Sequence, residues 1–162
     1  DDNHYDIISA FIKWMRGSDT NATLYYLARM LDAGEDPKFI ARRMIIFASE
    51  DIGLAGNGAL SLAVSCFNAI EKIGMPEAKY IIYHTAVALS LSKKSRKTTE
   101  AMYKAESLAK EYPNLEVPLH IRNGATKLMK NLGYGKDYKW ESGFKHPKGY
   151  LPEEIKDISI FD

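Results

Sequence analysis

The sequence predicts an all-α protein, a bundle of antiparallel helix pairs followed by an irregular, aromatic-rich tail. Apolar residues recur at intervals of three and four along most of residues 1–132, which is the spacing of one face of a helix. Glycine or proline stands near each expected helix end, and no segment shows the alternation typical of a strand. We therefore expect one domain over 1–162, with a helical body over 1–132 and an ordered loop tail over 133–162.

Capping residues and breakers mark the expected helices. The first helix ends at Gly17, and either Ser18 or Asp19 is placed to cap the second, which closes at Gly34. Asp36 followed by Pro37 predicts a third start, because an N-cap acceptor and a proline in the first turn both favour a helix N-terminus. Further helices are expected from Asn57 to Gly74, from Pro76 through Leu89, from about Ser95 to Pro113, with Ala101, Ala105, Leu108 and Ala109 in register, and from Ala125 to Leu132.

The first helix is apolar on much of its surface, which suits burial on two sides. One apolar line contains Tyr5, Ile8, Ile12 and Met15, and a second contains Ile7, Phe11 and Trp14. Together with the aromatic tail, this is more apolar surface than one small bundle needs, so it favours self-association. The residues that we consider for such an interface are Tyr5, Ile8, Phe11, Trp14, Arg16, Glu50 and Asp51.

Composition is that of a globular domain, with 46% hydrophobic and 27% charged residues. The single cysteine, Cys66, excludes an intrachain disulfide, and no Cys/His cluster has zinc-ligand spacing. No apolar run is long enough to cross a membrane and no signal peptide is visible, so we expect a cytoplasmic protein without a membrane partner. The missing initiator Met and the immediate helical pattern are typical of an excised fragment.

The motifs of nucleotide chemistry are absent from the sequence. A phosphate-binding P-loop needs glycines leading to Gly-Lys-Ser/Thr, whereas Gly135-Lys136 is followed by Asp137 and lacks the upstream glycine. There is no dinucleotide fingerprint, nucleophile elbow or paired-histidine metal motif. We therefore expect no catalytic, cofactor-binding or metal-binding residues in this chain, and no enzymatic activity of its own.

Glu50 and Asp51 stand at an expected helix C-terminus, where carboxylates oppose the helix dipole. The favoured interpretation is that arginines such as Arg29, Arg42 or Arg43 pair with them. A contact between subunits and an acid–base dyad are the alternatives. Arg16 is likewise expected to belong to a tight helix–helix turn, with contact to a neighbouring subunit or domain as the alternative.

The histidines are scattered at positions 4, 84, 120 and 146. Only His84 falls within an expected helix among apolar neighbours, so we expect it to be a structural histidine. A metal site is disfavoured because no second ligand stands three or four residues away.

Positive charge gathers near the C-terminus although the whole chain has a formal net charge of only +1. Residues 120–150 contain seven Lys and Arg against Asp137 and Glu141, which gives 7 − 2 = +5. Aromatic residues are interleaved with these cations, an arrangement that can stack bases and meet phosphates. The favoured interpretation is nevertheless a packed C-terminal loop whose lysines are solvated, and a subunit or domain interface and nucleic-acid contact are the alternatives. The candidate DNA contacts are Arg122, Lys127, Lys130, Tyr134, Lys136 and Tyr138.

Long ordered blocks resemble the C-terminal region of one ATPase family. They include His4–Phe11, Arg16–Asp19, Leu27–Pro37, Ile40–Arg43, Ala48–Ala55, Val117–Asn123, Thr126–Lys130 and Leu132–Lys136. In these blocks the sequence is similar to the replication-associated recombination protein A family, the MgsA/RarA AAA+ ATPases, which are related to the Werner-helicase-interacting proteins. Trp14 and Gly124-Ala125 depart from the family's usual residues, and the tail after Lys136 follows it loosely.

The resemblance implies a parent protein whose AAA+ module, with its ATP and Mg²⁺, lies outside this chain. It also implies a collar like that of the clamp loaders, in which this region joins subunits into a homotetramer. The parent would be a DNA-dependent ATPase of replication-fork maintenance, recombination and repair, nucleoid-associated, with single-strand-binding protein as a partner. Our leading hypothesis is therefore a tetramerisation domain, and the alternative is a direct DNA- or partner-protein-binding module of the same ATPase.

Overall fold

The computed structural model describes residues 2–124 and 126–162, with side chains described from Tyr5 onward, so the His4 side chain lies outside the described part. All regular elements in these residues are helical, which confirms the predicted all-α class. The α-helices are α1 (Asp2–Arg16), α2 (Thr20–Asp32), α3 (Pro37–Phe47), α4 (Gly58–Ile73), α5 (Lys79–Leu91), α6 (Lys97–Glu111) and α7 (Lys127–Asn131). Shorter turns are the π-helix η1 (Ala48–Ile52) and the 3₁₀ turns η2 (Gly53–Ala55), η3 (Leu119–Ile121) and η4 (Glu153–Ile155).

The chain forms two compact units. The first runs to Met102 and also includes Phe161; the second contains Tyr103–Ile160 and Asp162. The division falls inside α6, whereas the sequence analysis placed the change from helical body to tail after residue 132. The second unit therefore contains the later part of α6, α7 and the irregular tail.

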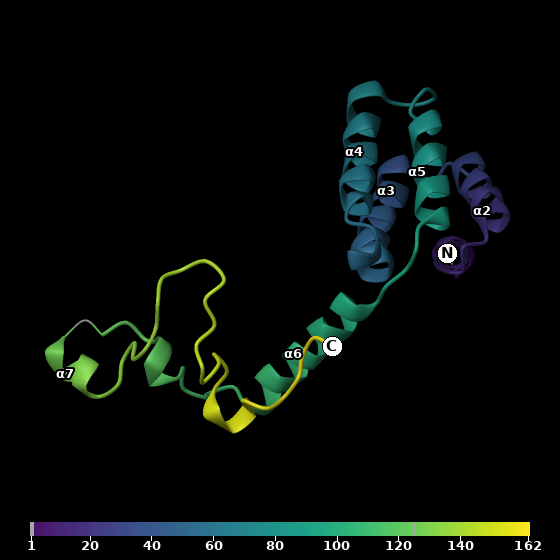
Figure 1. Ribbon diagram of the computed structural model, residues 1–162. Coiled ribbons are helices and arrows are strands. Elements are labelled where there is room, and N and C mark those ends of the chain that lie inside the picture. Colours follow the sequence, from purple (N-terminus) through teal and green to yellow (C-terminus); the bar gives the residue numbers. More distant parts are fainter. Residues whose placement is uncertain (1, 125) are drawn as a thin grey trace. The chain divides into compact units, whose positions relative to one another are not determined.

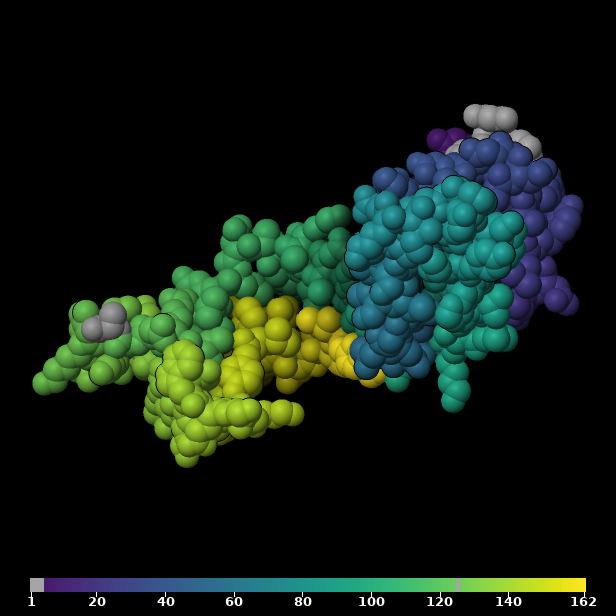
Figure 2. Space-filling view, turned by 90° about the horizontal axis from the view of Figure 1, so that it is seen from above, coloured from purple at the N-terminus to yellow at the C-terminus, as the bar shows by residue number. Residues whose placement is uncertain are grey.

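The first unit packs α1 to α5 around a single apolar core. Figure 1 shows α2, α3, α4 and α5 side by side, with α1 seen end-on, so α1 runs across its neighbours instead of forming an antiparallel pair. Helices α4 and α5 are an antiparallel pair joined by a short turn, and they remain adjacent in the space-filling view (Figure 2). The largest buried core side chains include Phe11, Met15, Leu27, Ile40, Met44, Phe47, Ile82 and Leu89.

The predicted capping residues are present at two helix starts. The Asp19 side chain accepts a hydrogen bond from the Ala22 amide (3.0 Å), and the Asp36 side chain accepts one from the Lys38 amide (2.9 Å). These bonds satisfy backbone N–H groups that a helix leaves free at its N-terminus. Helix α4 also starts where the sequence predicted, with Asn57 at its N-cap position, but the Asn57 side chain makes no capping bond. The start predicted at Pro76 was wrong, because α5 begins at Lys79.

Cys66 lies in this core. Burial raises the pKa of its thiol, against a smaller opposing effect of a hydrogen bond with Thr85. A thiol kept protonated in apolar surroundings is inert, so Cys66 acts as a core side chain. Within the described residues, no helix combines the length and apolarity needed to cross a bilayer.

Candidate functional site

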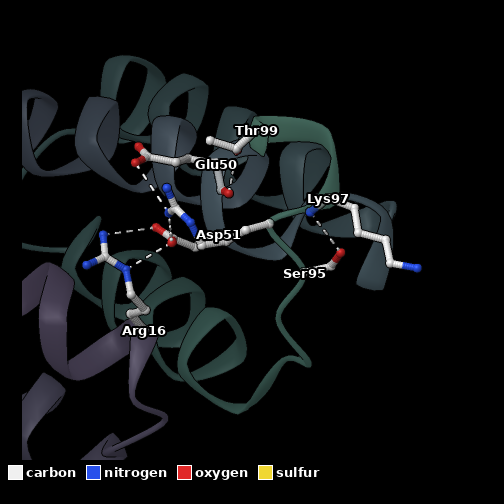
Figure 3. A network of polar contacts seen from close by, with 7 residues as sticks. Arg16, Glu50, Asp51, Ser95, Lys97 and Thr99 are labelled. Carbon is white, nitrogen blue, oxygen red and sulfur yellow. Dashed lines mark hydrogen bonds and ion pairs between the residues drawn. The ribbon is translucent and has the colours of Figure 1, made fainter. Parts of the chain in front are cut away.

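Asp51 is the buried charged centre of the first unit. It lies in the π-helical turn η1, and only 1% of it is exposed. Its Oδ1 accepts hydrogen bonds from Arg16 Nε (2.9 Å) and Arg96 Nη1 (2.7 Å), and its Oδ2 accepts one from Arg16 Nη2 (3.3 Å). Figure 3 shows Arg16 reaching Asp51 from a separate element. The carboxylate is thus bound by two cations, the condition under which a charge can be buried without being neutralised.

The same turn holds the start of α6 through its backbone. The Ser95 amide donates to the Asp51 carbonyl (2.9 Å), and the Thr99 hydroxyl donates to the Glu50 carbonyl (2.8 Å). The Glu50 side chain is more exposed and lies 3.5 Å from Arg96. The hydrogen bond with Asp51 is the main reason that the pKa of Arg96 is raised, so its guanidinium stays charged. These bonds join α1, η1 and the start of α6.

The structure confirms arginine pairing for these two acids but corrects the arginines. Arg16 and Arg96 take the place of Arg29, Arg42 and Arg43. Arg16 therefore binds within its own chain, and Asp51 is inaccessible to a second subunit. Neither acid is arranged as an acid–base dyad, because Asp51 is committed to two guanidinium groups.

Helix α1 contains five of the residues proposed for an interface and buries two of them. Ile8 and Phe11 lie in the core, so their assignment to an intersubunit surface was wrong. The two apolar lines of α1 converge on one wide buried face, because side chains three and four residues apart lie on the same side of a helix. Tyr5 and Trp14, at the margins of that face, remain exposed.

Trp14 belongs to an aromatic patch, which we define as Trp14, Tyr25, Tyr26 and Arg29. The Trp14 and Tyr26 rings are stacked with centroids 6.4 Å apart, and Tyr25 meets Tyr26 edge-on at 5.2 Å. The Arg29 guanidinium carbon lies 5.7 Å and 5.8 Å from the two tyrosine ring centroids. Trp14 is 39% exposed and Tyr25 is 59% exposed. The patch is therefore both internally ordered and accessible.

Helix α6 presents a second accessible surface, the alanine face, which we define as Ala101, Ala105, Leu108 and Ala109. These residues share one side of the helix, as the sequence predicted. Ala105 and Ala109 are exposed, while Ala101 and Leu108 are half-buried. Alanines four residues apart form a low ridge against which another helix can pack closely.

The histidines with a structural role are His120 and His146 of the second unit, whereas the sequence favoured His84. His84 is exposed on α5, so its structural role was wrongly predicted. His146 is buried, and its ring lies 4.3 Å from that of His120. His146 Nδ1 accepts from the Lys148 amide (3.1 Å), so Nε2 carries the proton and donates to the Lys136 carbonyl (2.7 Å).

The segment after α6 folds around a cavity of about 360 Å³, the basic–aromatic pocket. Its lining includes Arg122, Lys130, Tyr134, Lys136, Tyr138 and Trp140. Five of the six candidate DNA contacts therefore line one cavity. Lys127 is exposed on α7 and is not part of the lining. Trp140, which the candidate set omitted, is the most exposed aromatic side chain of the wall at 82%.

Gly135 allows two segments of this loop, near Leu119–Arg122 and near Gly135 itself, to approach closely. Its amide donates to the Leu119 carbonyl (2.8 Å), its φ is +67°, and an added Cβ would lie 3.1 Å from the Arg122 carbonyl oxygen. Left-handed backbone is readily adopted by glycine and disfavours residues with a Cβ. This close approach sets the backbone of the pocket wall.

Gly135→Ala is expected to destabilise the second unit by about 2 kcal/mol, from left-handed strain plus the close carbonyl contact. Gly143→Ala is the matched control, because Gly143 also has positive φ (+79°) but a Cβ there would meet nothing within 4 Å. Hydrogen exchange of the amides in 119–138 measures the local opening free energy. Equal protection in the two variants would contradict the role assigned to the close approach.

Metal ligation finds no support among residues 2–124 and 126–162, where no group of three or more His, Cys, Asp or Glu side chains is arranged to hold an ion. The geometry instead offers a basic–aromatic pocket and two accessible packing surfaces.

Comparison of the amino-acid sequence with known proteins identifies its family. The chain matches "MgsA AAA+ ATPase C terminal" over residues 17–162. It belongs to this family. An uncharacterized protein of Thermotoga maritima is 50% identical over 99% of this chain and 26% of its own length. Replication-associated recombination protein A of Coxiella burnetii is 44% identical over 93% of this chain and 35% of its own length. ATPase WRNIP1 of Dictyostelium discoideum is 42% identical over 99% of this chain and 19% of its own length.

The family membership confirms the resemblance of the ordered sequence blocks. The chain is the C-terminal domain of MgsA/RarA-type AAA+ ATPases, and relatives of this type are named for replication-associated recombination. It spans well under half the length of each of these relatives.

Proposed function

We propose that this domain assembles copies of its parent ATPase into a homotetramer. The observation that carries the proposal is the aromatic patch on α1 and α2. Trp, Tyr and Arg are the residues most enriched among those that dominate protein–protein binding energy. Here they are held in one ordered cluster with Trp14 and Tyr25 accessible.

A second copy of the chain is the occupant that the patch fits. It contains both halves of a cation–π pair, a guanidinium in Arg29 and electron-rich rings in Tyr25 and Tyr26. Two copies related by a twofold axis can therefore satisfy each other with the same residues, which is the requirement for an isologous contact.

One isologous surface closes a dimer, so a tetramer of dihedral symmetry needs another. The alanine face of α6 supplies that surface in this proposal. A 15-residue helix gains most of its stability from packing an apolar face, and part of this face is exposed in the single chain. The tetramer is then a dimer of dimers, with one contact through the aromatic patch and the other through α6.

Variants that remove one surface each are expected to give dimers, because the other contact remains. Trp14→Ala removes the centre of the aromatic patch, and Ala105→Glu places a charge on the alanine face. The double variant is expected to be a monomer. Light scattering after size exclusion measures these masses.

Matched controls separate contact loss from general damage. Tyr80→Ala removes an exposed tyrosine of α5 outside the patch, and Ser107→Glu adds the same charge to the opposite side of α6. Both controls are expected to keep the mass of the unchanged protein. Retention of that mass by the double variant would rule out these two surfaces.

For the parent protein, the proposal extends to an ATP- and Mg²⁺-dependent AAA+ ATPase that acts on DNA in the cytoplasm, near the nucleoid. Single-strand-binding protein is its proposed protein partner. The AAA+ name of the family supports the ATPase part of this proposal. The role of the present chain in it is to set the spacing and number of ATPase modules.

A further inference from the structure

We infer that the basic–aromatic pocket of the second unit is a binding site for single-stranded nucleic acid. In this inference an unpaired base stacks on Trp140, and the adjoining backbone phosphates bind to the cations of the pocket. The inference is independent of the tetramer, because the pocket residues belong neither to the aromatic patch nor to the alanine face.

Charge segregation is the first support. The formal charge of residues 120–150 is +5 and that of the whole chain is +1, so the remaining residues carry a formal charge of 1 − 5 = −4. Three of the cations in this segment, Arg122, Lys130 and Lys136, line the pocket. A local concentration of cations on an otherwise acidic chain is the electrostatic footprint of a polyanion site.

The aromatic side chains are positioned to receive a flat ring. Trp140 meets Tyr138 edge-on, with centroids 5.0 Å apart and an interplanar angle of 80°. Tyr138 in turn meets Phe144 edge-on at 5.9 Å. With 82% of Trp140 exposed, most of the indole surface remains accessible. An accessible aromatic face beside cations is the arrangement with which proteins stack unpaired bases.

Arg122 is held in place beside the rings. Its Nε donates to the Val117 carbonyl (2.6 Å), and its guanidinium carbon lies 5.6 Å from the Tyr134 ring centroid. Its ion pair with Glu116 is solvent-exposed on the glutamate side and measures 3.4 Å, so it contributes little and competes weakly with a phosphate. The guanidinium therefore lies preoriented for a phosphate at the pocket rim.

A second cavity adjoins the basic–aromatic pocket. Tyr138 and Trp140 also line a neighbouring cavity of about 510 Å³ whose other walls are Ile121, Phe144 and Tyr150. Bases in a duplex are stacked on each other and offer no free face to these rings. Single strands do offer such faces, which is why the pocket favours them over a double helix.

Binding of the whole chain to a fluorescein-labelled oligodeoxythymidine, of about 15 nucleotides to exceed one site, tests the inference by anisotropy. Trp140→Ala is expected to weaken binding roughly tenfold, because a base stack is lost, with the salt dependence unchanged. Lys136→Ala is expected to reduce the slope of log affinity against log salt by about 0.7, since one phosphate contact is lost.

The control for diffuse charge is Lys145→Ala, which removes an exposed cation of the same segment that does not line the pocket. Base stacking is also read from quenching of tryptophan fluorescence, which should occur in the unchanged chain and be lost in Trp140→Ala, where Trp14 is the remaining tryptophan. Wild-type affinity in Trp140→Ala, an equal change of slope in Lys145→Ala, or equal competition by a duplex would each overturn the inference.

Discussion

Asp51→Ala is expected to lower the free energy of unfolding of the first unit by about 3 kcal/mol, the scale found when a buried ion pair loses one partner. The change removes three hydrogen bonds to Arg16 and Arg96 and leaves space where a buried carboxylate stood. Both arginines are partly exposed and can reach water, which keeps the effect at the lower end of that range. For a unit of this size the melting temperature should fall by about 15 °C.

Glu50→Gln is the matched control, because Glu50 is the adjacent acid and contacts the same Arg96 from a more exposed position. Its effect should remain within about 0.5 kcal/mol, as for other exposed ion pairs. Denaturant unfolding followed by far-UV circular dichroism measures both variants. Similar stabilities for Asp51→Ala and the unchanged protein would mean that the buried network does not hold α1, η1 and α6 together.

Phe11→Ala is expected to destabilise the first unit by about 3–5 kcal/mol, because a fully buried aromatic side chain is replaced by a cavity. The effect is intrinsic to the fold, so the loss should be the same at low and high protein concentration. Urea unfolding over a range of protein concentrations checks this expectation.

Trp14→Ala, one turn further along the same helix, provides the comparison. Trp14 is partly exposed, so its removal should cost the single chain only about 1 kcal/mol while changing the solution mass. The roles assigned to these two residues would be reversed by either of two results. One is a destabilisation by Phe11→Ala that varies with protein concentration, and the other is a loss of stability in Trp14→Ala with no change of solution mass.

Local features of the fold were predictable because short-range chemistry determines them. Asp19 and Asp36 cap helices within three residues of themselves, and the spacing of apolar residues marks the helical segments. The faces of α1 were misjudged, since periodicity identifies an apolar surface but not what covers it. Phe11 and Trp14 belong to the same apolar line in sequence, yet α1 crosses its neighbours so that only one of them is fully buried.

The long-range ion pairs of the first unit could not be predicted from the sequence. Asp51 is 35 residues from Arg16 and 45 from Arg96, and no local pattern selects these two arginines over Arg42 or Arg43. The ring contact between His120 and His146 spans an irregular loop, so helical spacing pointed instead to His84.

The basic–aromatic pocket was predictable in part. Its residues lie in one short segment, so composition alone marked Arg122, Lys130, Tyr134, Lys136 and Tyr138. What composition does not contain is the concavity, which depends on the positive φ at Gly135 and on the hydrogen bond that fixes the Lys136 carbonyl. Trp140 was missed because its exposure becomes visible only once the loop is folded.

The solution mass of the unchanged chain, measured by light scattering over a range of concentration and salt, tests the assembly proposal most directly. The account predicts a stable species near four times 18.3 kDa, with mass that persists on dilution. A chain that stays at 18.3 kDa throughout would contradict the claim that the aromatic patch and the alanine face assemble this domain.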